Sequence, residues 1–436
     1  MEPLTRRETL DILSCMGVEL PRTTRLPNDV LDKRLRDALN HAQHRSGLPP
    51  SSLDPARLPR WPAGEPLLKV LRRVDLGEAL AIEDAERAGK AYERELFQDV
   101  FWDLGQTMVA IGKVIDIGLT WCVVQDPQRE TGAILLRFLC VLCADGNTPG
   151  VVLTYRAINR ETGAEGAEWT SFQWARDSAE KRLPQEVIGV SEIKASVLEL
   201  KLLLKLLAMN APLLPLDYKP PKDPLEERFK LSVLMPLAPL GFDVLGRLNS
   251  DVGCALCGKK QTSRCSQCQS VSYCGAECQK ADWPAHKQTC RSLKGGRWVT
   301  IPFRMSFPDE PNNTWLSRRS DCNSILDESM YTLRKALGGE SGPPPNIHGE
   351  KTFLVKLQAP HGVPQQAFMI YDRRKSFRSV FFWREDAPSV YDDCISEITG
   401  PRIAFGGRKM YRWAKRTGDF ELSVCLDREP NMDIRW

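Results

Sequence analysis

The chain has 436 residues, of which 42% are hydrophobic and 27% charged, a composition typical of a globular protein with roughly two to four domains. Its 60 Lys and Arg residues against 56 Asp and Glu residues give a net charge of only +4, so the charge of the whole chain does not indicate nucleic-acid binding. The most apolar stretches, 133–144 and 197–209, contain charged residues and are shorter than the ~20 residues of a membrane span; with no secretory signal, we expect no membrane partner and a location in the nucleus, the cytoplasm or both.

The first region, residues 1–97, is predicted to be helical with Pro-rich breaks. Apolar residues recur at helical spacing from Leu31 to Ala42, directly after the capping sequence Pro27-Asn28-Asp29. The segment 47–66 contains six prolines and is expected to be a linker or an extended strap. The helical pattern resumes over 67–97.

The second region, residues 98–248, is predicted to be a mixed α+β domain. Apolar runs separated by turn-forming residues indicate strands at 121–125, 133–144 and 151–157. Further along, Ser191 is expected to cap a long helix, because apolar residues recur at helical spacing from Ile193 to Leu207.

The third region, residues 251–294, contains a cluster of cysteines. Seven of the 14 cysteines fall between Cys254 and Cys290, and in an intracellular protein such clustering indicates metal ligands rather than disulfides. With one histidine they form four closely spaced pairs: Cys254-x2-Cys257, Cys265-x2-Cys268, Cys274-x3-Cys278 and His286-x3-Cys290. Eight such ligands suffice for two tetrahedral sites, so we expect two Zn²⁺ ions per chain.

The number of ligands does not by itself decide which four share an ion. Sequential pairing leaves only seven residues between the first two pairs, whereas interleaved pairing leaves loops of 16 and 17 residues, close to the spacing of about 15–20 residues that is usual in zinc sites. Interleaving is therefore favoured, with Cys254, Cys257, Cys274 and Cys278 on one ion and Cys265, Cys268, His286 and Cys290 on the other.

The segment from Cys254 to Cys290 resembles the MYND finger family. The resemblance is carried by the cysteine spacing, the Tyr273-Cys274 step and the run Gln279-x3-Trp283-x2-His286. It implies a cross-braced finger that binds its two zinc ions in the interleaved manner. It also implies a groove for short Pro-rich peptides, which the family's pattern assigns to Ser266, Gln279 and Trp283 of this chain. An extended Pro-rich peptide loses little entropy on binding and can stack on a tryptophan.

The fourth region, residues 298–436, is predicted to be a separate α+β domain. Alternating apolar residues indicate strands at 353–357 and 420–426, with further strands at 368–371 and 379–383 and a short helix near 389–398. The C-terminal half also resembles that of uncharacterised fungal MYND-bearing proteins, which implies a shared module and no activity. The fold class expected is therefore multidomain α+β, with a double-zinc finger between two larger mixed α/β regions.

The zinc ions are expected to be structural, because protein side chains fill all eight coordination positions and a catalytic zinc keeps one open. We therefore expect a zinc-binding adaptor that docks Pro-rich peptides of partner proteins, with transcriptional regulation as a candidate setting, and not an enzyme. A divergent lysine methyltransferase is a less favoured alternative, since the Asn-His motif of that class is not matched after the finger. The motifs GxSxG and GxGxxG and the P-loop are also missing.

Nucleic-acid binding is the remaining alternative. The stretch 408–416 interleaves basic residues with Tyr411 and Trp413, a composition that can contact phosphates and stack on bases. On a strand, however, the two rings share one face and Arg412 takes the other, as in an ordinary half-buried edge strand. The near-neutral chain also disfavours nucleic acid.

Overall fold

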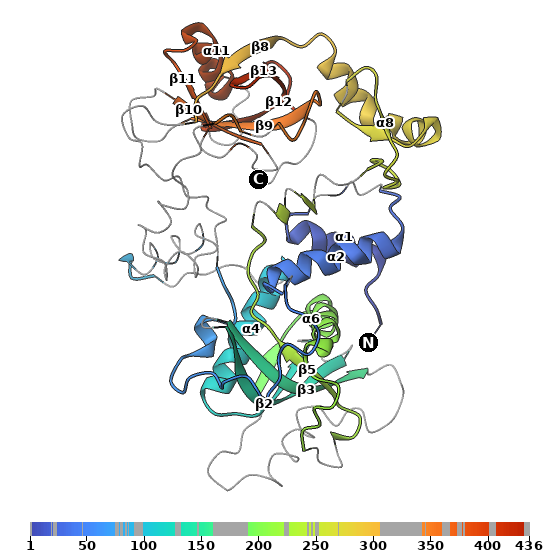
Figure 1. Cartoon of the computed structure of the whole chain (residues 1–436), viewed down its shortest axis with the longest axis vertical. Coiled ribbons are helices and arrows are strands. Elements are labelled where there is room, and N and C mark those ends of the chain that lie inside the picture. The colour runs from blue at the N-terminus through green and yellow to red at the C-terminus, as the bar shows by residue number, and fades with distance from the viewer. Residues whose placement is uncertain are drawn as a thin grey trace. The chain divides into compact units, whose positions relative to one another are not determined.

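The computed structural model of the chain (Figure 1) describes most of residues 2–430. The description leaves out residues 19, 21–23, 46, 75–77, 79–81, 83, 84, 86, 91–98, 127–131, 146, 147, 160–190, 222–225, 242, 243, 246, 249–252, 269, 306–341, 345, 360–366, 373–376, 378, 379 and 401–406.

The chain forms two compact units. Unit 1 contains the described parts of 1–16 and 28–240, and unit 2 those of 17–27 and 241–430. Both units combine helices with a sheet, which confirms the α+β class. The finer division into four regions stays a prediction. In the described part of the chain, no helix is long and apolar enough to cross a membrane.

The helices of unit 1 are fixed by local capping and by burial of their apolar residues. They are α1 (Arg6–Cys15), α2 (Asn28–Ala42), η1 (Leu67–Lys69), α4 (Val100–Asp116), α6 (Val197–Asn210) and η3 (Ala211–Leu213). The helix predicted after Pro27 is confirmed as α2, whose residues Leu31, Leu35 and Leu39 are buried. Much of the helical pattern predicted over 67–97 lies outside the described residues.

The helix predicted to start at Ser191 begins later. Residues Ser191–Lys194 form strand β4, in which Ile193 pairs with Val124. Helix α6 is capped instead by Ser196, whose hydroxyl accepts a hydrogen bond from the Glu199 N–H at 3.3 Å, while the Ser196 N–H donates to the Glu199 carboxylate at 2.7 Å. This reciprocal capping box fixes the start of the helix. The predicted start at Ser191 was therefore wrong, because a short strand precedes the helix.

The sheet of unit 1 has the strand order β4-β1-β2-β3-β5. Its other members are β1 (Trp121–Gln125), β2 (Gly132–Asp145), β3 (Thr148–Asn159) and β5 (Lys230–Leu234), so the three predicted strands are confirmed. The Pro-rich segment before them lies along this unit as a strap, because the Leu53 N–H donates to the Leu213 carbonyl at 2.9 Å and the Leu53 side chain is buried beside Leu142 and Val233.

The sheet of unit 2 is antiparallel, with the strand order β11-β10-β9-β12-β13-β8. The strands are β8 (Trp298–Pro302), β9 (Phe353–Gln358), β10 (Ala367–Asp372), β11 (Val380–Trp383), β12 (Lys409–Gly418) and β13 (Glu421–Cys425). Helix α11 (Pro388–Thr399) packs on one face and buries Tyr391 and Cys394 beside Phe368. The strands and the helix predicted for this region are confirmed.

Strand β12 differs from the prediction, because it is not an edge strand. It lies between β9 and β13 (Figure 1), and Tyr411 and Trp413 are only 2% and 6% exposed. Arg412 is buried on the opposite face, where its guanidinium donates to the Leu426 carbonyl and lies 3.4 Å from the Glu397 carboxylate. Both aromatic rings and one of the cations in the strip 408–416 therefore serve the packing of the sheet.

Candidate metal centres and docking surface

The finger begins with a tight turn around its first cysteine pair. The Cys254 N–H donates to the Lys259 carbonyl, and the Gly258 N–H donates back to the Cys254 carbonyl, both at 2.8 Å. Gly253 enters this turn with a φ of +60°, and a Cβ at this position would lie 2.5 Å from the Lys259 carbonyl oxygen. Only glycine fits such a position without strain, and the turn directs both thiols of the pair to one side.

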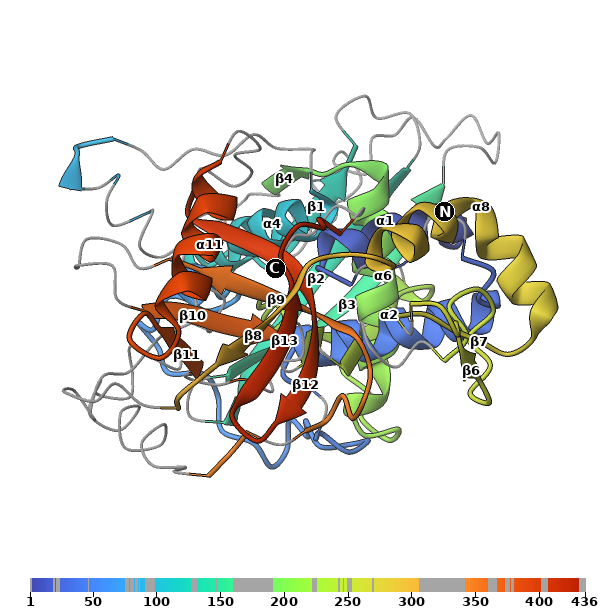
Figure 2. The same ribbon diagram turned by 90° about the horizontal axis from the view of Figure 1, so that it is seen from above.

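The second cysteine pair is held by a short hairpin. Strands β6 (Ser263–Arg264) and β7 (Ser272–Tyr273) pair in antiparallel fashion. The Cys265 N–H donates to the Val271 carbonyl at 2.9 Å, which closes the loop containing Cys265 and Cys268. Figure 2 shows this hairpin next to helix α8 (Ala276–Leu293), which supplies further metal ligands.

Helix α8 contributes ligands to both centres. Cys278 lies in its first half, and His286 and Cys290 lie in its second half, four residues apart and so on one face. Pro284 lies between the two halves and, lacking an N–H, cannot donate the hydrogen bond that the helix would otherwise make there.

The structure brings the eight ligand side chains into two groups of four. Cys254, Cys257, Cys274 and Cys278 form one group, and Cys265, Cys268, His286 and Cys290 form the other, with the ligand atoms of each group within 4.8 Å of one another. This is the interleaved arrangement.

The spacing of the ligand atoms fits tetrahedral zinc. In the first group the Sγ–Sγ distances are 3.4 Å for Cys257–Cys274, 3.6 Å for Cys274–Cys278 and 3.8 Å for Cys278–Cys257. A tetrahedral ion with zinc–sulfur bonds of about 2.3 Å separates its sulfurs by about 3.8 Å. In the second group, Cys268 Sγ lies 3.3 Å from His286 Nε2. The two groups are consistent with two Zn²⁺ ions per chain.

The thiols of the two groups differ in how readily they ionise. Burial disfavours the Cys254 thiolate, but backbone N–H groups of Cys257, Cys274 and Leu256 stabilise it and lower the pKa to about 6. In contrast, the hydrogen bond between Cys278 and Cys274 raises the Cys278 pKa to about 12, and burial beside Cys268 raises the Cys290 pKa to about 12. Four clustered thiols cannot all ionise unless a bound cation stabilises them.

Comparison with known proteins identifies this segment. A family model described as MYND finger matches residues 254–290. Residues 254–290 are a MYND finger. The chain is 54% identical over 39 residues to the human histone-lysine N-methyltransferase SMYD3 (9% of each protein), and 36% identical over 91 residues to mouse Protein CBFA2T2 (20% of this chain, 15% of that protein).

A third relative is ubiquitin carboxyl-terminal hydrolase 19 of Arabidopsis thaliana, 48% identical over 42 residues, or 9% of this chain and 6% of that protein. The chain thus spans 6% to 15% of the length of these three relatives, so the similarity covers only a small part of each protein. No solved structure matches the chain.

Two of the three residues predicted for peptide binding, Ser266 and Trp283, lie next to ligands of the second metal group, whereas Gln279 follows Cys278 of the first group. Ser266 is exposed between Cys265 and Cys268, and Gln279 is partly exposed on α8. The Trp283 ring is partly buried and meets the ring of His286 edge-on, with centroids 6.1 Å apart and an angle of 66°.

Sequence reasoning missed two features that stabilise this surface. The Tyr273 hydroxyl donates to the Asp282 carboxylate at 2.6 Å, which links the hairpin to α8. In addition, the apolar core of the finger continues into the sheet of unit 2, because Leu256 and Leu293 belong to one buried cluster with Tyr411 and Trp413. Pairing across distant segments gives no local signal in the sequence.

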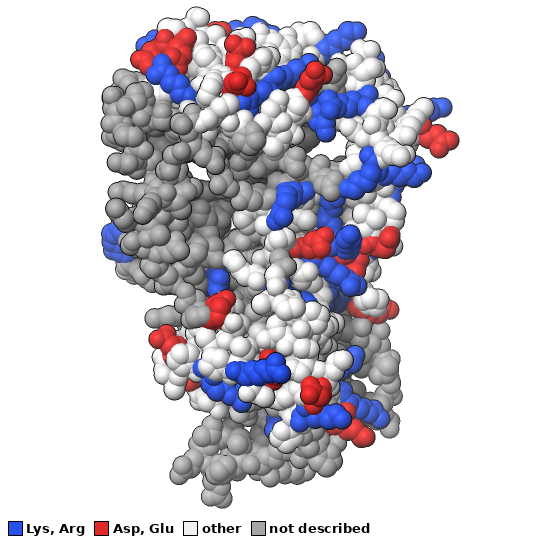
Figure 3. Space-filling model, in the orientation of Figure 1, with Lys and Arg blue, Asp and Glu red and all other residues white. Residues whose placement is uncertain are grey.

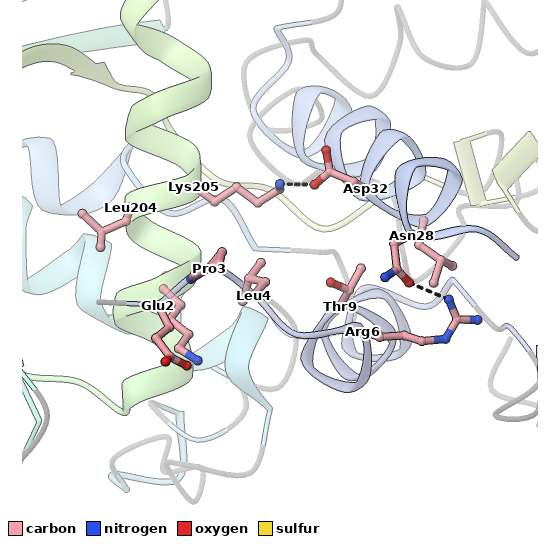
Figure 4. Close-up of a pocket in the computed structure, with 11 residues that line it drawn as sticks. Glu2, Pro3, Leu4, Arg6, Thr9, Asn28, Asp32, Leu204 and Lys205 are labelled. Atoms are coloured by element: carbon pink, nitrogen blue, oxygen red, sulfur yellow. Dashed lines mark hydrogen bonds and ion pairs between the residues drawn. The ribbon is translucent and has the colours of Figure 1, made fainter.

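Unit 1 has a separate hollow of about 400 Å³ between the start of the chain, α2 and α6 (Figure 4). Most of the charged groups of its lining have a side-chain partner. Lys205 pairs with Asp32 (Figure 4), and Arg6 donates to the Asn28 side-chain oxygen at 2.8 Å. Lys201 pairs with Glu8 at 2.8 Å. These pairs satisfy the groups that would otherwise recognise a ligand.

Proposed function

We propose that the chain is a non-catalytic adaptor whose MYND finger docks short Pro-rich peptides of partner proteins on a surface made by Ser266, Gln279 and Trp283. The observation that carries the proposal is the position of the Trp283 ring. It is held against His286, a ligand of the second metal group, yet remains partly exposed. A rigidly held ring with one accessible face is a suitable platform for proline stacking.

The polar groups beside the ring have the character that such a peptide needs. A peptide in the polyproline II conformation has few N–H groups, and its carbonyls accept hydrogen bonds. The Gln279 amide can donate to such a carbonyl, and the two residues are neighbours because they lie four apart on α8. The Ser266 hydroxyl is exposed on the loop of the same metal group and can act as a second donor.

The metal groups support a docking role over catalysis. Each group already has four protein ligands, so neither zinc ion would keep an open position for water or substrate. A setting in transcriptional regulation, in the nucleus, the cytoplasm or both, belongs to the proposal and is supported by the similarity of the finger to that of a histone-lysine N-methyltransferase.

A random peptide display library selected on the full-length chain tests the proposal. We expect the wild type to enrich Pro-rich sequences and the variant Trp283→Ala to lose that enrichment, while Trp283→Phe, which keeps an aromatic face, retains part of it. Zinc analysis of each variant checks that the finger is intact. Ser266→Ala is compared with Gln267→Ala, because both residues are exposed on the same loop. Equal enrichment of Pro-rich peptides by the wild type and a zinc-loaded Trp283→Ala variant would contradict the proposal.

A further inference from the structure

The surface that carries Gln279 and Trp283 continues along α8 as a row of positive charges. Lys287 and Arg291 follow Trp283 at intervals of four residues, and residues four apart on a helix are neighbours on its surface. Lys280 lies seven residues before Lys287, two turns away on the same side, and Lys294 is the residue that caps the end of the helix. We call Lys280, Lys287, Arg291 and Lys294 the basic stripe.

The basic stripe carries exposed charge that no described acidic side chain balances. All four residues are exposed, and among the described residues none of the four has an ion-pair partner. The only acidic residues on α8 are Glu277, in its first turn, and Asp282, which is engaged by the Tyr273 hydroxyl. Figure 3 shows Lys and Arg side chains gathered over α8 and the rest of the finger.

Two other cations of unit 2 form ion pairs with acidic residues. Arg297 lies only three residues after Lys294, and its guanidinium is 2.6 Å from Asp393 and 3.7 Å from Glu397. Arg304 likewise pairs with Glu385 and Asp386. The cations of the basic stripe are therefore unpaired among the described residues, unlike these two arginines, and they follow one another along a single helix.

We propose that the basic stripe recognises acidic residues of the docked peptide, so that the partner motif is a Pro-rich core followed or preceded by a run of Asp or Glu. This inference rests on the proposed function and specifies its partner. From Trp283 to Lys294 the helix advances by about 16 Å at 1.5 Å per residue. An extended peptide covers that length in about five residues, so the acidic run adjoins the Pro-rich core directly.

The charges fit an acidic peptide better than a nucleic acid. They form one row that starts beside a partly buried ring, whereas a nucleic-acid groove combines a broad basic surface with several accessible rings. The rings of Tyr411 and Trp413, which could have supplied such a platform, are buried in the sheet. Charge complementarity of this kind steers association and discriminates between partners.

Three synthetic peptides test the inference by fluorescence polarisation with the full-length, zinc-loaded chain. They share one Pro-rich core taken from the display selection and carry four flanking Glu, four Gln or four Lys residues. We expect the Glu-flanked peptide to bind most tightly and to weaken as salt rises from 50 to 500 mM, because salt screens exposed charges. The double variant Lys287→Gln/Arg291→Gln should weaken the Glu-flanked peptide by roughly two- to tenfold, as expected for two exposed ion pairs, and leave the Gln-flanked peptide unchanged.

The control variant is Lys259→Gln/Arg264→Gln, which removes two exposed cations of the finger outside α8 and should affect the two peptides little. Equal binding of the Glu- and Gln-flanked peptides overturns the inference while leaving the proposed function intact. Binding of none of the three peptides counts against the proposed function itself. If a 20-base-pair DNA duplex or a 20-nucleotide RNA displaces the Glu-flanked peptide and its own binding is lost in the Lys287→Gln/Arg291→Gln variant, the stripe is a nucleic-acid site and the inference is wrong.

Discussion

The finger and the six-stranded sheet belong to the same unit but are stabilised by different interactions. The face of the sheet under α11 buries a continuous aliphatic and aromatic core that includes Phe368, Val355 and Leu422. The buried residues of the finger are mostly the metal ligands themselves, with Leu256, Tyr273 and Leu293 as the apolar remainder. Hydrophobic burial therefore specifies the sheet, whereas metal coordination must supply most of the folding free energy of the finger.

Removal of zinc should produce the largest difference between the two regions. We expect elemental analysis to find two zinc ions per chain, and a strong chelator to unfold residues 254–290, since structural zinc contributes on the order of 10 kcal/mol to small fingers. Hydrogen exchange should increase throughout the finger, while the strands under α11 stay protected. A zinc content near one or zero would exclude the double-zinc finger.

The substitution Phe368→Ala should destabilise the sheet and leave the zinc ions of the finger bound. Phe368 is fully buried between Phe382 and Tyr391, and truncation of such a side chain costs about 3–5 kcal/mol. We expect a lower midpoint of thermal unfolding with two zinc ions still bound. Loss of zinc in this variant would show that the finger depends on the sheet more than the comparison implies.

The substitution Gly253→Ala tests the turn at the first cysteine pair. The positive φ and the 2.5 Å approach of a Cβ to the Lys259 carbonyl should cost about 1–3 kcal/mol, measured as weaker zinc retention against a competing chelator. Gly275→Ala is the matched control, because a Cβ at Gly275 meets nothing within 4 Å and its backbone is extended. Equal zinc retention by the two variants would show that a side chain at residue 253 does not strain the turn.

The smallest effect is expected for Asp393→Asn, which removes the exposed ion pair with Arg297. Half-exposed pairs of this kind contribute below about 1 kcal/mol because water and salt screen them. Chemical denaturation should show little change from the wild type, and the small difference should vanish at high salt. A loss as large as that of Phe368→Ala would mean that surface charge, and not apolar burial, holds α11 on the sheet.

The parts of the structure that the sequence predicts are those with a local signal. An apolar run identified the strand at 121–125 and alternating apolar residues identified the strand at 353–357, and the spacing of the finger's cysteines favoured the grouping that the structure has. The errors come from tertiary context. The pairing of Ile193 with Val124 overrides a helical pattern. Contacts with the Leu426 carbonyl and with Glu397 of α11 bury Arg412, which reads as a surface residue in the sequence.

The shared cluster of Leu293, Tyr411 and Trp413 has a consequence for how the finger can be studied. Gly296 leads from α8 to β8, and a Cβ there would lie 2.4 Å from Cys425 Sγ, so the chain leaves the finger with no room for a flexible joint. A fragment cut at residue 294 would expose Leu256 and Leu293 to water where the sheet now adjoins their cluster. Such a fragment would expose an apolar surface that is buried in the whole chain, and it would tend to bind other molecules nonspecifically. The finger of this chain is therefore not an independent domain.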